Sequence, residues 1–246
     1  MKYFLLPLGC QMNQSDTERV KTILQGMGFM PTENEDEATI LGIIACSVRQ
    51  KGIDKVYSRI MKWNEMKNRK NCITFVSGCI LPADRERFLK LFDLVFTMND
   101  LPDLPDMIRQ YGIVVPTSQQ PIVNGQQPTV NIQRPLVPLF NKKDKINPSA
   151  NMDRFWVIEP DHISEFEAFI PIQNGCNKFC TYCAVPYTRG REVSRKSEDI
   201  LTELKELVQK DYKIITLLGQ NVNSYGLDKK GEEINFAELL RRIGEY

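Results

Sequence analysis

The stretch TILGIIAC, residues 39–46, is an apolar run that ends in a cysteine. A short apolar run that is rich in isoleucine predicts a strand buried on both faces, as the strands of parallel sheets are. Similar runs occupy residues 3–8, 72–77 and 94–97. Apolar residues with helical spacing follow these four runs, over residues 15–27, 51–68, 84–91 and 104–111. This strand–helix alternation predicts an α/β fold with a parallel sheet in residues 1–112.

The first of the predicted helices carries a capping signal. Ser15 is an N-cap residue type, and Glu18 stands at the position of its capping-box partner. We therefore predict that this helix begins at Ser15.

Three cysteines closely follow the predicted strands. Cys10, Cys46 and Cys79 each come just after a strand ends. The carboxyl ends of parallel strands share one edge, where ligands bind, so we expect these thiols to converge on one crevice. Cys72 begins a strand instead, and we predict that it is a buried structural thiol at the opposite end.

Residues 113–165 differ in composition from what precedes them. Six prolines fall within residues 113–150, at Pro116, Pro121, Pro128, Pro135, Pro138 and Pro148. With Gln, Asn and Thr between them, they predict an extended linker. A β-meander with proline turns is the alternative.

Residues 166–246 repeat the alternation twice. Strands are predicted at 166–172 and 214–218, and helices at 197–210 and 236–243. Two strands cannot close a barrel, which needs eight. We therefore expect an incomplete (β/α) barrel, which is either a fragment or completed by another chain.

Composition excludes several classes of protein. The 246 residues carry 32 Lys and Arg against 31 Asp and Glu, a net charge of +1, so no global field attracts nucleic acid or membranes. Hydrophobic residues at 42% and charged residues at 26% exclude a wholly disordered chain. No apolar run reaches the roughly 18 residues of a spanning helix, and the N-terminus lacks a signal-peptide pattern. We expect a cytoplasmic protein without membrane contact.

The number of cysteines is the unusual feature of this composition. Seven cysteines without a signal peptide argue against disulfides and favour metal ligands or redox thiols. The only histidine, His162, excludes a histidine-rich metal site and has no predicted role.

Cys176, Cys180 and Cys183 form a CxxxCxxC motif directly after a strand. A zinc ribbon would need a second CxxC knuckle, which is absent, and we keep zinc only as a minor alternative. Three thiolates can hold three irons of a 4Fe–4S cluster and leave the fourth iron open to a substrate or cofactor.

Four segments, taken in order, resemble the radical S-adenosylmethionine (SAM) methylthiotransferase family. They are GCQMNQSD (9–16), CSVRQKGIDKV (46–56), GCNKFCTYCAVPYTRGREVSR (175–195) and ITLLGQNVNSYG (215–226). The resemblance implies an N-terminal methylthiotransferase domain at 1–112, the linker at 113–165 and a partial radical SAM barrel at 166–246. Residues Ile44-Ala45 and Ile80-Leu81-Pro82 depart from the family pattern around the second and third cysteines.

The resemblance also assigns roles to residues. It implies that the CxxxCxxC cysteines are the catalytic centre and bind a 4Fe–4S cluster, with Tyr182 against the adenine of SAM. Gln220 and Asn221 would contact the methionyl part of SAM, or they are polar caps at a strand end. A second 4Fe–4S cluster, which supplies or relays sulfur, would be bound by Cys10, Cys46 and Cys79.

The reaction implied by the resemblance is tRNA modification. A methylthio group would be added to C2 of N6-isopentenyladenosine at position 37, in the anticodon stem-loop. An electron donor and a sulfur donor would be partners, and we expect a monomer. The alternatives within the family are threonylcarbamoyl-adenosine of tRNA and an aspartate of a ribosomal protein.

Two further expectations concern this particular chain. Full members continue through the rest of the barrel and a small RNA-binding domain, so we expect this chain alone to be weak or inactive. A truncated, inactive iron–sulfur module is therefore a further alternative. A basic run could bind tRNA phosphates or be a solvated loop; its members are Arg189, Arg191, Arg195 and Lys196.

Overall fold

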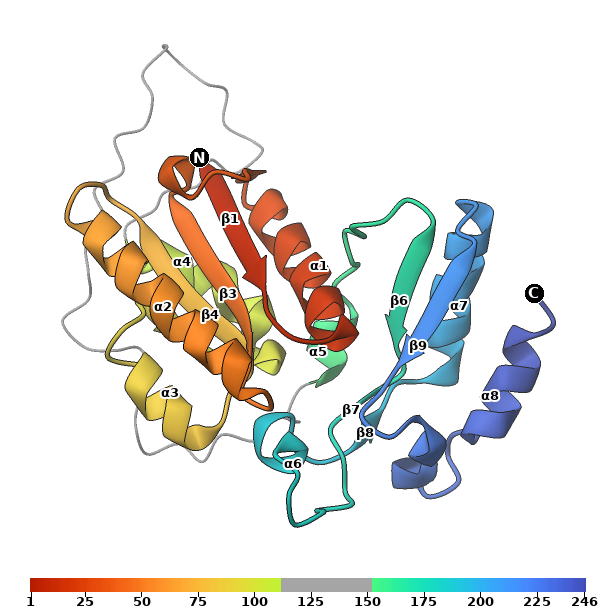
Figure 1. Cartoon of the computed structure of the whole chain (residues 1–246). Helices are drawn as coiled ribbons and strands as arrows, with labels where there is room; N and C mark the ends of the chain where they lie inside the picture. The colour runs from red at the N-terminus through yellow and green to blue at the C-terminus, as the bar shows by residue number, and fades with distance from the viewer. Residues whose placement is uncertain (112–151) are drawn as a thin grey trace.

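The computed structural model describes residues 1–111 and 152–246 (Figure 1). The predicted linker at 113–165 therefore lies mostly outside the described residues. In the described part of the chain, no helix is both long and apolar enough to cross a membrane.

Residues 1–111 contain the predicted parallel sheet, with strand order β2-β1-β3-β4-β5. The strands are β1 (Lys2–Pro7), β2 (Met30–Pro31), β3 (Ile40–Cys46), β4 (Ile73–Cys79) and β5 (Leu94–Val95). All four neighbouring pairs are parallel. The register of β3 against β4 places Cys46 beside Cys79, so two of the predicted ligands meet at the same edge.

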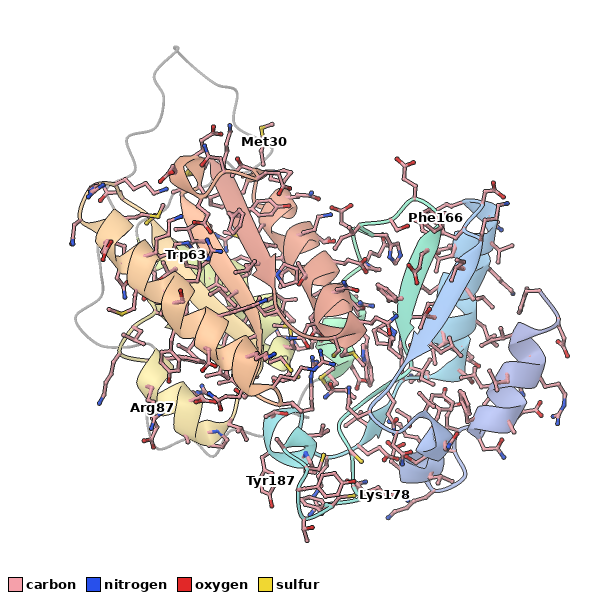
Figure 2. The ribbon with its side chains drawn as sticks, in the orientation of Figure 1. Met30, Trp63, Arg87, Phe166, Lys178 and Tyr187 are labelled. Atoms are coloured by element: carbon pink, nitrogen blue, oxygen red, sulfur yellow. The ribbon has the colours of Figure 1, made fainter. Side chains whose placement is uncertain are left out.

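Helices cover both faces of this sheet (Figure 1). They are α1 (Gln11–Gly26), α2 (Gln50–Lys67), α3 (Pro82–Phe88) and α4 (Leu104–Arg109), with 3-10 turns η1 (Glu35–Glu37) and η2 (Met98–Asp103). One apolar core lies under α1, η2 and α4, and a second lies under α2 and α3. Trp63 of α2 is fully buried in the second core (Figure 2). Cys72 is also buried there, as predicted.

The predicted start of the first helix is wrong. α1 begins at Gln11, with Cys10 as its N-cap, so Ser15 and Glu18 lie inside the helix and are buried. The side chain of Ser15 accepts a hydrogen bond from Arg19 instead of capping the helix. A capping box is recognised from a few neighbouring residues. Here the same polar side chains contact Arg19 and His162 instead of the helix end.

Residues 166–246 contain both predicted strand–helix repeats. β6 (Glu167–Pro171) pairs in parallel with β9 (Ile214–Leu218), and α7 (Ser197–Gln209) and α8 (Phe236–Ile243) pack on this pair. The sequence did not predict the short antiparallel pair of β7 (Gln173–Asn174) and β8 (Val193–Ser194). This pair closes a long loop that carries the CxxxCxxC motif and α6 (Val185–Thr188). The 3-10 turns η3 (Val222–Ser224) and η4 (Leu227–Lys229) follow β9.

A helix that the sequence did not predict lies near the end of the expected linker. α5 (Met152–Trp156) buries Met152, Phe155 and Trp156 in the core under α1. The irregular segment after it is tied to α1, because Thr22 Oγ1 donates to the Glu159 carbonyl at 2.6 Å. Residues 152–165 are therefore held on the N-terminal sheet, while the predicted domain limits stay a prediction.

Candidate functional site

The three thiols at the strand ends are here called the sheet cysteines: Cys10, Cys46 and Cys79. The turn after β1 passes very close to β3, because a Cβ added to Gly9 would lie 2.8 Å from the Cys46 Cβ. Gly9 has a φ of 136°, which glycine adopts readily and other residues rarely do. Cys46 and Cys79 are buried and Cys10 is exposed, so the group opens to solvent on one side.

Asn13 connects two of the sheet cysteines, Cys10 and Cys79. Its Oδ1 accepts hydrogen bonds from Cys10 Sγ at 3.5 Å and from Cys79 Sγ at 3.9 Å. Its Nδ2 donates to the carbonyls of Leu8 at 3.1 Å and Ala45 at 2.6 Å. One fully buried amide therefore holds two strand ends together. Sequence reasoning gave Asn13 no role, although it lies inside the GCQMN motif.

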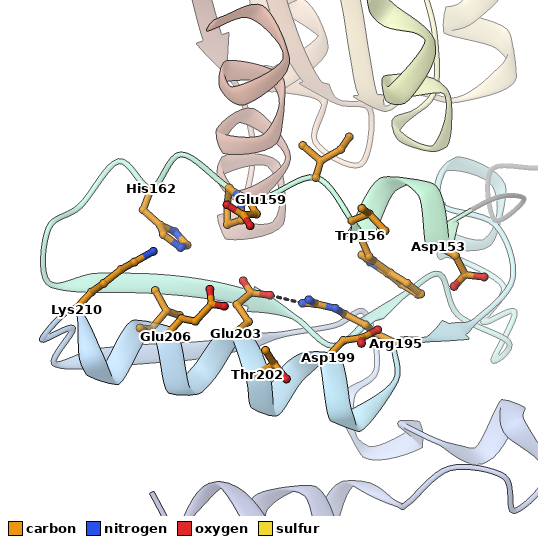
Figure 3. Close-up of a pocket in the computed structure, with 14 residues that line it drawn as sticks. Asp153, Trp156, Glu159, His162, Arg195, Asp199, Thr202, Glu203, Glu206 and Lys210 are labelled. Carbon is orange, nitrogen blue, oxygen red and sulfur yellow. Dashed lines mark hydrogen bonds and ion pairs between the residues drawn. The ribbon is translucent and has the colours of Figure 1, made fainter. Parts of the chain in front are cut away.

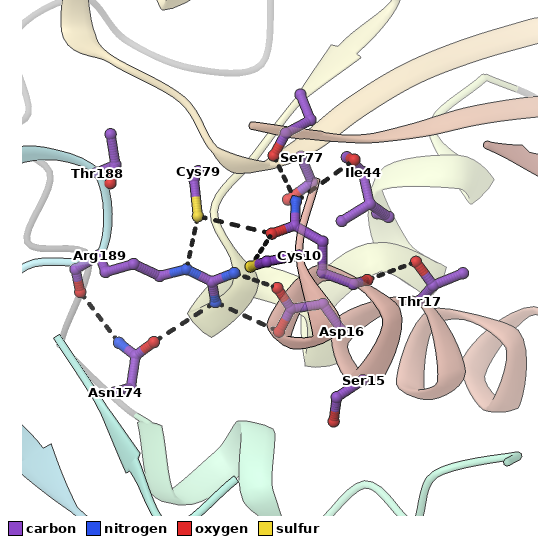
Figure 4. A network of polar contacts seen from close by, with 12 residues as sticks. Cys10, Ser15, Asp16, Thr17, Ile44, Ser77, Cys79, Asn174, Thr188 and Arg189 are labelled. Carbon is purple, nitrogen blue, oxygen red and sulfur yellow. Dashed lines mark hydrogen bonds and ion pairs between the residues drawn. The ribbon is translucent and has the colours of Figure 1, made fainter. Parts of the chain in front are cut away.

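Arg189 reaches the sheet cysteines from the other half of the chain (Figure 4). Its Nε lies 2.9 Å from Cys79 Sγ, and Nη2 lies 2.5 Å from Asp16 Oδ2. Burial raises the pKa of the Cys79 thiol to about 11, against the opposing effect of Arg189. Burial alone lowers the pKa of Arg189, but Asp16 and Cys79 outweigh it and the net shift is upward. The guanidinium is therefore charged, and it is placed against a sulfur atom.

The three thiols of the CxxxCxxC motif are called the loop cysteines: Cys176, Cys180 and Cys183. Cys176 is buried, Cys183 is half-buried and Cys180 is exposed. The Cys183 N–H donates to the Cys180 carbonyl at 2.9 Å, which forms a tight turn between them. The loop starts at Gly175 with a φ of 80°, and a Cβ there would lie 2.1 Å from the Arg191 carbonyl oxygen.

The predicted SAM contacts occupy different environments. Gln220 follows β9, and its Oε1 accepts from the Gly175 N–H at 2.5 Å, so it fastens the loop to the strand end. Asn221 donates to Ser224 Oγ at 2.8 Å. Tyr182 is 92% exposed. Their predicted contacts with SAM stay a prediction.

The basic run does not form one surface. Arg189 and Arg195 are buried and paired with Asp16 and Glu203, respectively. The expectation that these two arginines bind phosphate or solvent is therefore wrong. Asp16 lies far from Arg189 in the sequence, and Glu203 lies on the helix that follows Arg195. Arg191 is exposed and its guanidinium lies 5.3 Å from the centre of the Phe179 ring.

The donor chemistry of both cysteine sets suits iron–sulfur clusters. Cysteine thiolates are the usual protein ligands of such clusters. As they stand in residues 1–111 and 152–246, no three His, Cys, Asp or Glu side chains form a group that could hold a metal ion. Cys10 and Cys79 share one Asn13 oxygen, Cys46 lies beside Cys79 in the strand register, and the loop cysteines share one short loop. Each set therefore fits a cluster by donor type.

A separate cavity of about 300 Å³ lies between α7, α5 and the segment after α5 (Figure 3). The Arg195–Glu203 ion pair lines it, with Trp156 at one end and His162 and Lys210 at the other. His162 Nδ1 lies 3.3 Å from Glu18 Oε2, so the histidine is part of the contact between α1 and this segment. No cysteine lines this cavity, and it is distinct from both cysteine sets.

Residues 2–98 match the Uncharacterized protein family UPF0004, and residues 170–245 match the Radical SAM superfamily. The chain contains a UPF0004 domain and a radical SAM domain. The sheet cysteines lie in the UPF0004 domain and the loop cysteines in the radical SAM domain. The superfamily implies SAM and a 4Fe–4S cluster for the second domain. The predicted fold class is therefore confirmed.

Several curated relatives resemble almost the whole chain. Proteins of Clostridium perfringens (strain SM101) and Clostridium botulinum (strain Alaska E43) are 37% and 38% identical over 96% and 99% of this chain. A protein of Carboxydothermus hydrogenoformans is 36% identical over 98% of this chain. All three are named tRNA-2-methylthio-N(6)-dimethylallyladenosine synthase. The chain covers 48%, 49% and 50% of them, so it spans about half the length of the curated relatives it matches.

Proposed function

We propose that this chain forms part of a radical SAM methylthiotransferase that adds a methylthio group to C2 of N6-isopentenyladenosine at position 37 of tRNA. The observation that carries the proposal is the pair of cysteine sets, one in each domain, together with the hydrogen bond from Arg189, in the loop that carries one set, to Cys79 of the other set. The names of the relatives support the tRNA substrate. The target base, in a single-stranded loop, would be splayed out toward the site.

The residues divide the chemistry between the domains. The loop cysteines would hold a 4Fe–4S cluster, which supplies reductive cleavage of SAM when it is bound. The sheet cysteines would hold a second cluster, which would supply or relay sulfur when it is bound. Aromatic C2–H is a very weak acid, so general-base chemistry would not remove this hydrogen and a radical route is required.

Other residues would bind and orient rather than react. Gln220 would keep the loop cysteines at the end of β9, because it accepts from the Gly175 N–H. Tyr182, exposed beside Cys183, would cover the adenine of SAM. Asn221 would contact the methionyl group. An electron donor and a sulfur donor complete the proposed partners.

Metal analysis of the full 246-residue chain tests the cluster assignment. After anaerobic reconstitution we expect about eight irons and eight acid-labile sulfides per chain, the content of two 4Fe–4S clusters. Replacing all loop cysteines by alanine should leave about four of each, and replacing all sheet cysteines should do the same. Zinc instead of iron, or no loss in either variant, would overturn the proposal.

A second experiment separates an enzyme from a passive iron–sulfur module. The reconstituted chain is reduced with dithionite in the presence of SAM, and 5′-deoxyadenosine is measured by chromatography. We expect cleavage in the wild type and none in the loop-cysteine variant. If the chain binds clusters but does not cleave SAM, the passive iron–sulfur module would be favoured. Nucleoside mass spectrometry of tRNA from a deletion strain then distinguishes isopentenyladenosine from threonylcarbamoyl-adenosine as the substrate.

A further inference from the structure

Arg189 crosses from the radical SAM domain into the group of sheet cysteines. It follows α6, yet its guanidinium lies among residues of the UPF0004 domain and is only 4% exposed. Nε lies 2.9 Å from Cys79 Sγ. Within residues 1–111 and 152–246, no other arginine or lysine donates a hydrogen bond to a sheet cysteine.

The direction of the Nε–H group is fixed by three other contacts. Asp16 accepts from Nη2 at 2.5 Å and from Nη1 at 3.3 Å, and it is 1% exposed. Asn174 accepts from Nη1 at 3.5 Å and donates to the Arg189 carbonyl at 3.0 Å. The guanidinium is planar and its donors form a rigid fork, so holding one edge on Asp16 sets where Nε points.

We propose that Arg189 is a positioning residue that donates an N–H···S hydrogen bond to Cys79 as a cluster ligand and thereby raises the reduction potential of the cluster on the sheet cysteines. This inference rests on the proposed function, because it requires a cluster at that place. Reduction adds negative charge to a cluster. Hydrogen bonds to its sulfurs stabilise that charge and are among the factors that set the potential.

Asp16 does not cancel this effect. The carboxylate lies on the Nη edge of the guanidinium and Cys79 lies at Nε, so the positive group stands between the two. Burial makes the arrangement stronger, because water does not screen it. The same arginine also joins the two domains, so the potential of one site depends on the docking of the other.

The test uses the full chain with all loop cysteines replaced by alanine, so that only the sheet cysteines can bind a cluster. The reduction potential is measured by an optical and EPR redox titration after reconstitution. In Arg189→Gln we expect a reduction equilibrium constant at least tenfold lower, which is about 59 mV for a one-electron couple. The paired exchange Asp16→Arg with Arg189→Asp keeps an ion pair between the domains but removes the N–H···S bond. It should show the same lowering.

Arg195 provides the matched control. It is buried at the end of the same loop and forms an ion pair with Glu203, and within the described residues it donates no hydrogen bond to a cysteine. Arg195→Gln should leave the potential unchanged. If Arg189→Gln loses its cluster, Arg189→Lys decides. A lysine lacks the planar fork that holds Asp16 with one edge and aims Nε–H at Cys79, so the potential should also fall.

The outcomes are distinguishable from those of the proposed function. A parent chain that binds no iron at the sheet cysteines would contradict the proposed function itself. A cluster of four irons whose potential is the same in the parent and in the Arg189 variants would overturn this inference alone. An equal shift in Arg195→Gln would overturn it too, because the effect would then come from general destabilisation.

Discussion

The two cysteine sets are built in opposite ways. The sheet cysteines come from three strand ends spread over residues 10–79, and only the paired strands bring them together. The loop cysteines lie within residues 176–183, and a single loop carries all of them. The first set depends on the fold of a whole domain, and the second depends on the backbone of one loop. A change can therefore damage either set without the other.

The largest expected effect is the loss of the loop site alone. In Gly175→Ala the new Cβ would lie 2.1 Å from the Arg191 carbonyl oxygen, and the positive φ adds strain, so the loop must move. We expect about four of eight irons to be lost on reconstitution, with the sheet cluster kept. Gly231→Ala is the control, since it has a φ of 95° but no atom within 4 Å. Full iron content in Gly175→Ala would contradict the prediction.

Asn13→Ala should have the converse effect on the sheet site. It removes the amide that joins the carbonyls of Leu8 and Ala45 and leaves them buried without this partner. We expect the free energy of unfolding to fall by about 2–3 kcal/mol, measured by urea denaturation of the metal-free chain. Asn34→Ala, which removes an exposed cap of η1, should cost about 1 kcal/mol or less. Equal losses in both variants would show that the Asn13 contacts contribute no more to stability than an exposed helix cap.

Cys72→Ala sharpens the comparison because it changes a thiol that belongs to neither set. Cys72 is 1% exposed in the core under α2, at the far end of β4 from Cys79. We expect the iron content to be unchanged and the free energy of unfolding to fall by about 1 kcal/mol. A loss of iron would mean that a seventh thiol takes part in cluster binding.

The smallest expected effect on stability is that of Tyr182→Ala. This side chain is 92% exposed, so unfolding should change by less than about 0.5 kcal/mol. The proposed contact with adenine predicts weaker SAM binding to the reconstituted chain, measured by equilibrium dialysis. Tyr187→Ala, in the same loop and 60% exposed, should leave SAM binding unchanged. Equal SAM affinity in both variants would remove Tyr182 from the proposed site.

The sequence predicted features that depend on local or repeated patterns. β9 and α8 begin and end where apolar spacing places them, at Ile214–Leu218 and Phe236–Ile243. The strand-end rule predicted that the sheet cysteines share one edge, and Cys46 and Cys79 lie side by side there. These predictions succeeded because periodicity and strand ends are visible in a short window.

Long-range contacts could not be predicted in the same way. α5 has only five residues and is stable because Phe155 and Trp156 pack on a distant core. The ion pair between Asp16 and Arg189 spans 173 residues, so the basic run looked like a surface when half of it is buried. A charged residue reveals its partner only when the fold is known.

The separation of Arg189 from the cysteine it contacts has a consequence for synthesis on the ribosome. The three strands that carry the sheet cysteines are complete by Cys79, and Arg189 follows 110 residues later. At about 5–20 residues per second, this delay is on the order of ten seconds. Throughout that interval Arg189 has not been made and cannot cover Cys79. A cluster loaded on the sheet cysteines in that interval would be bound before the second domain docks on them.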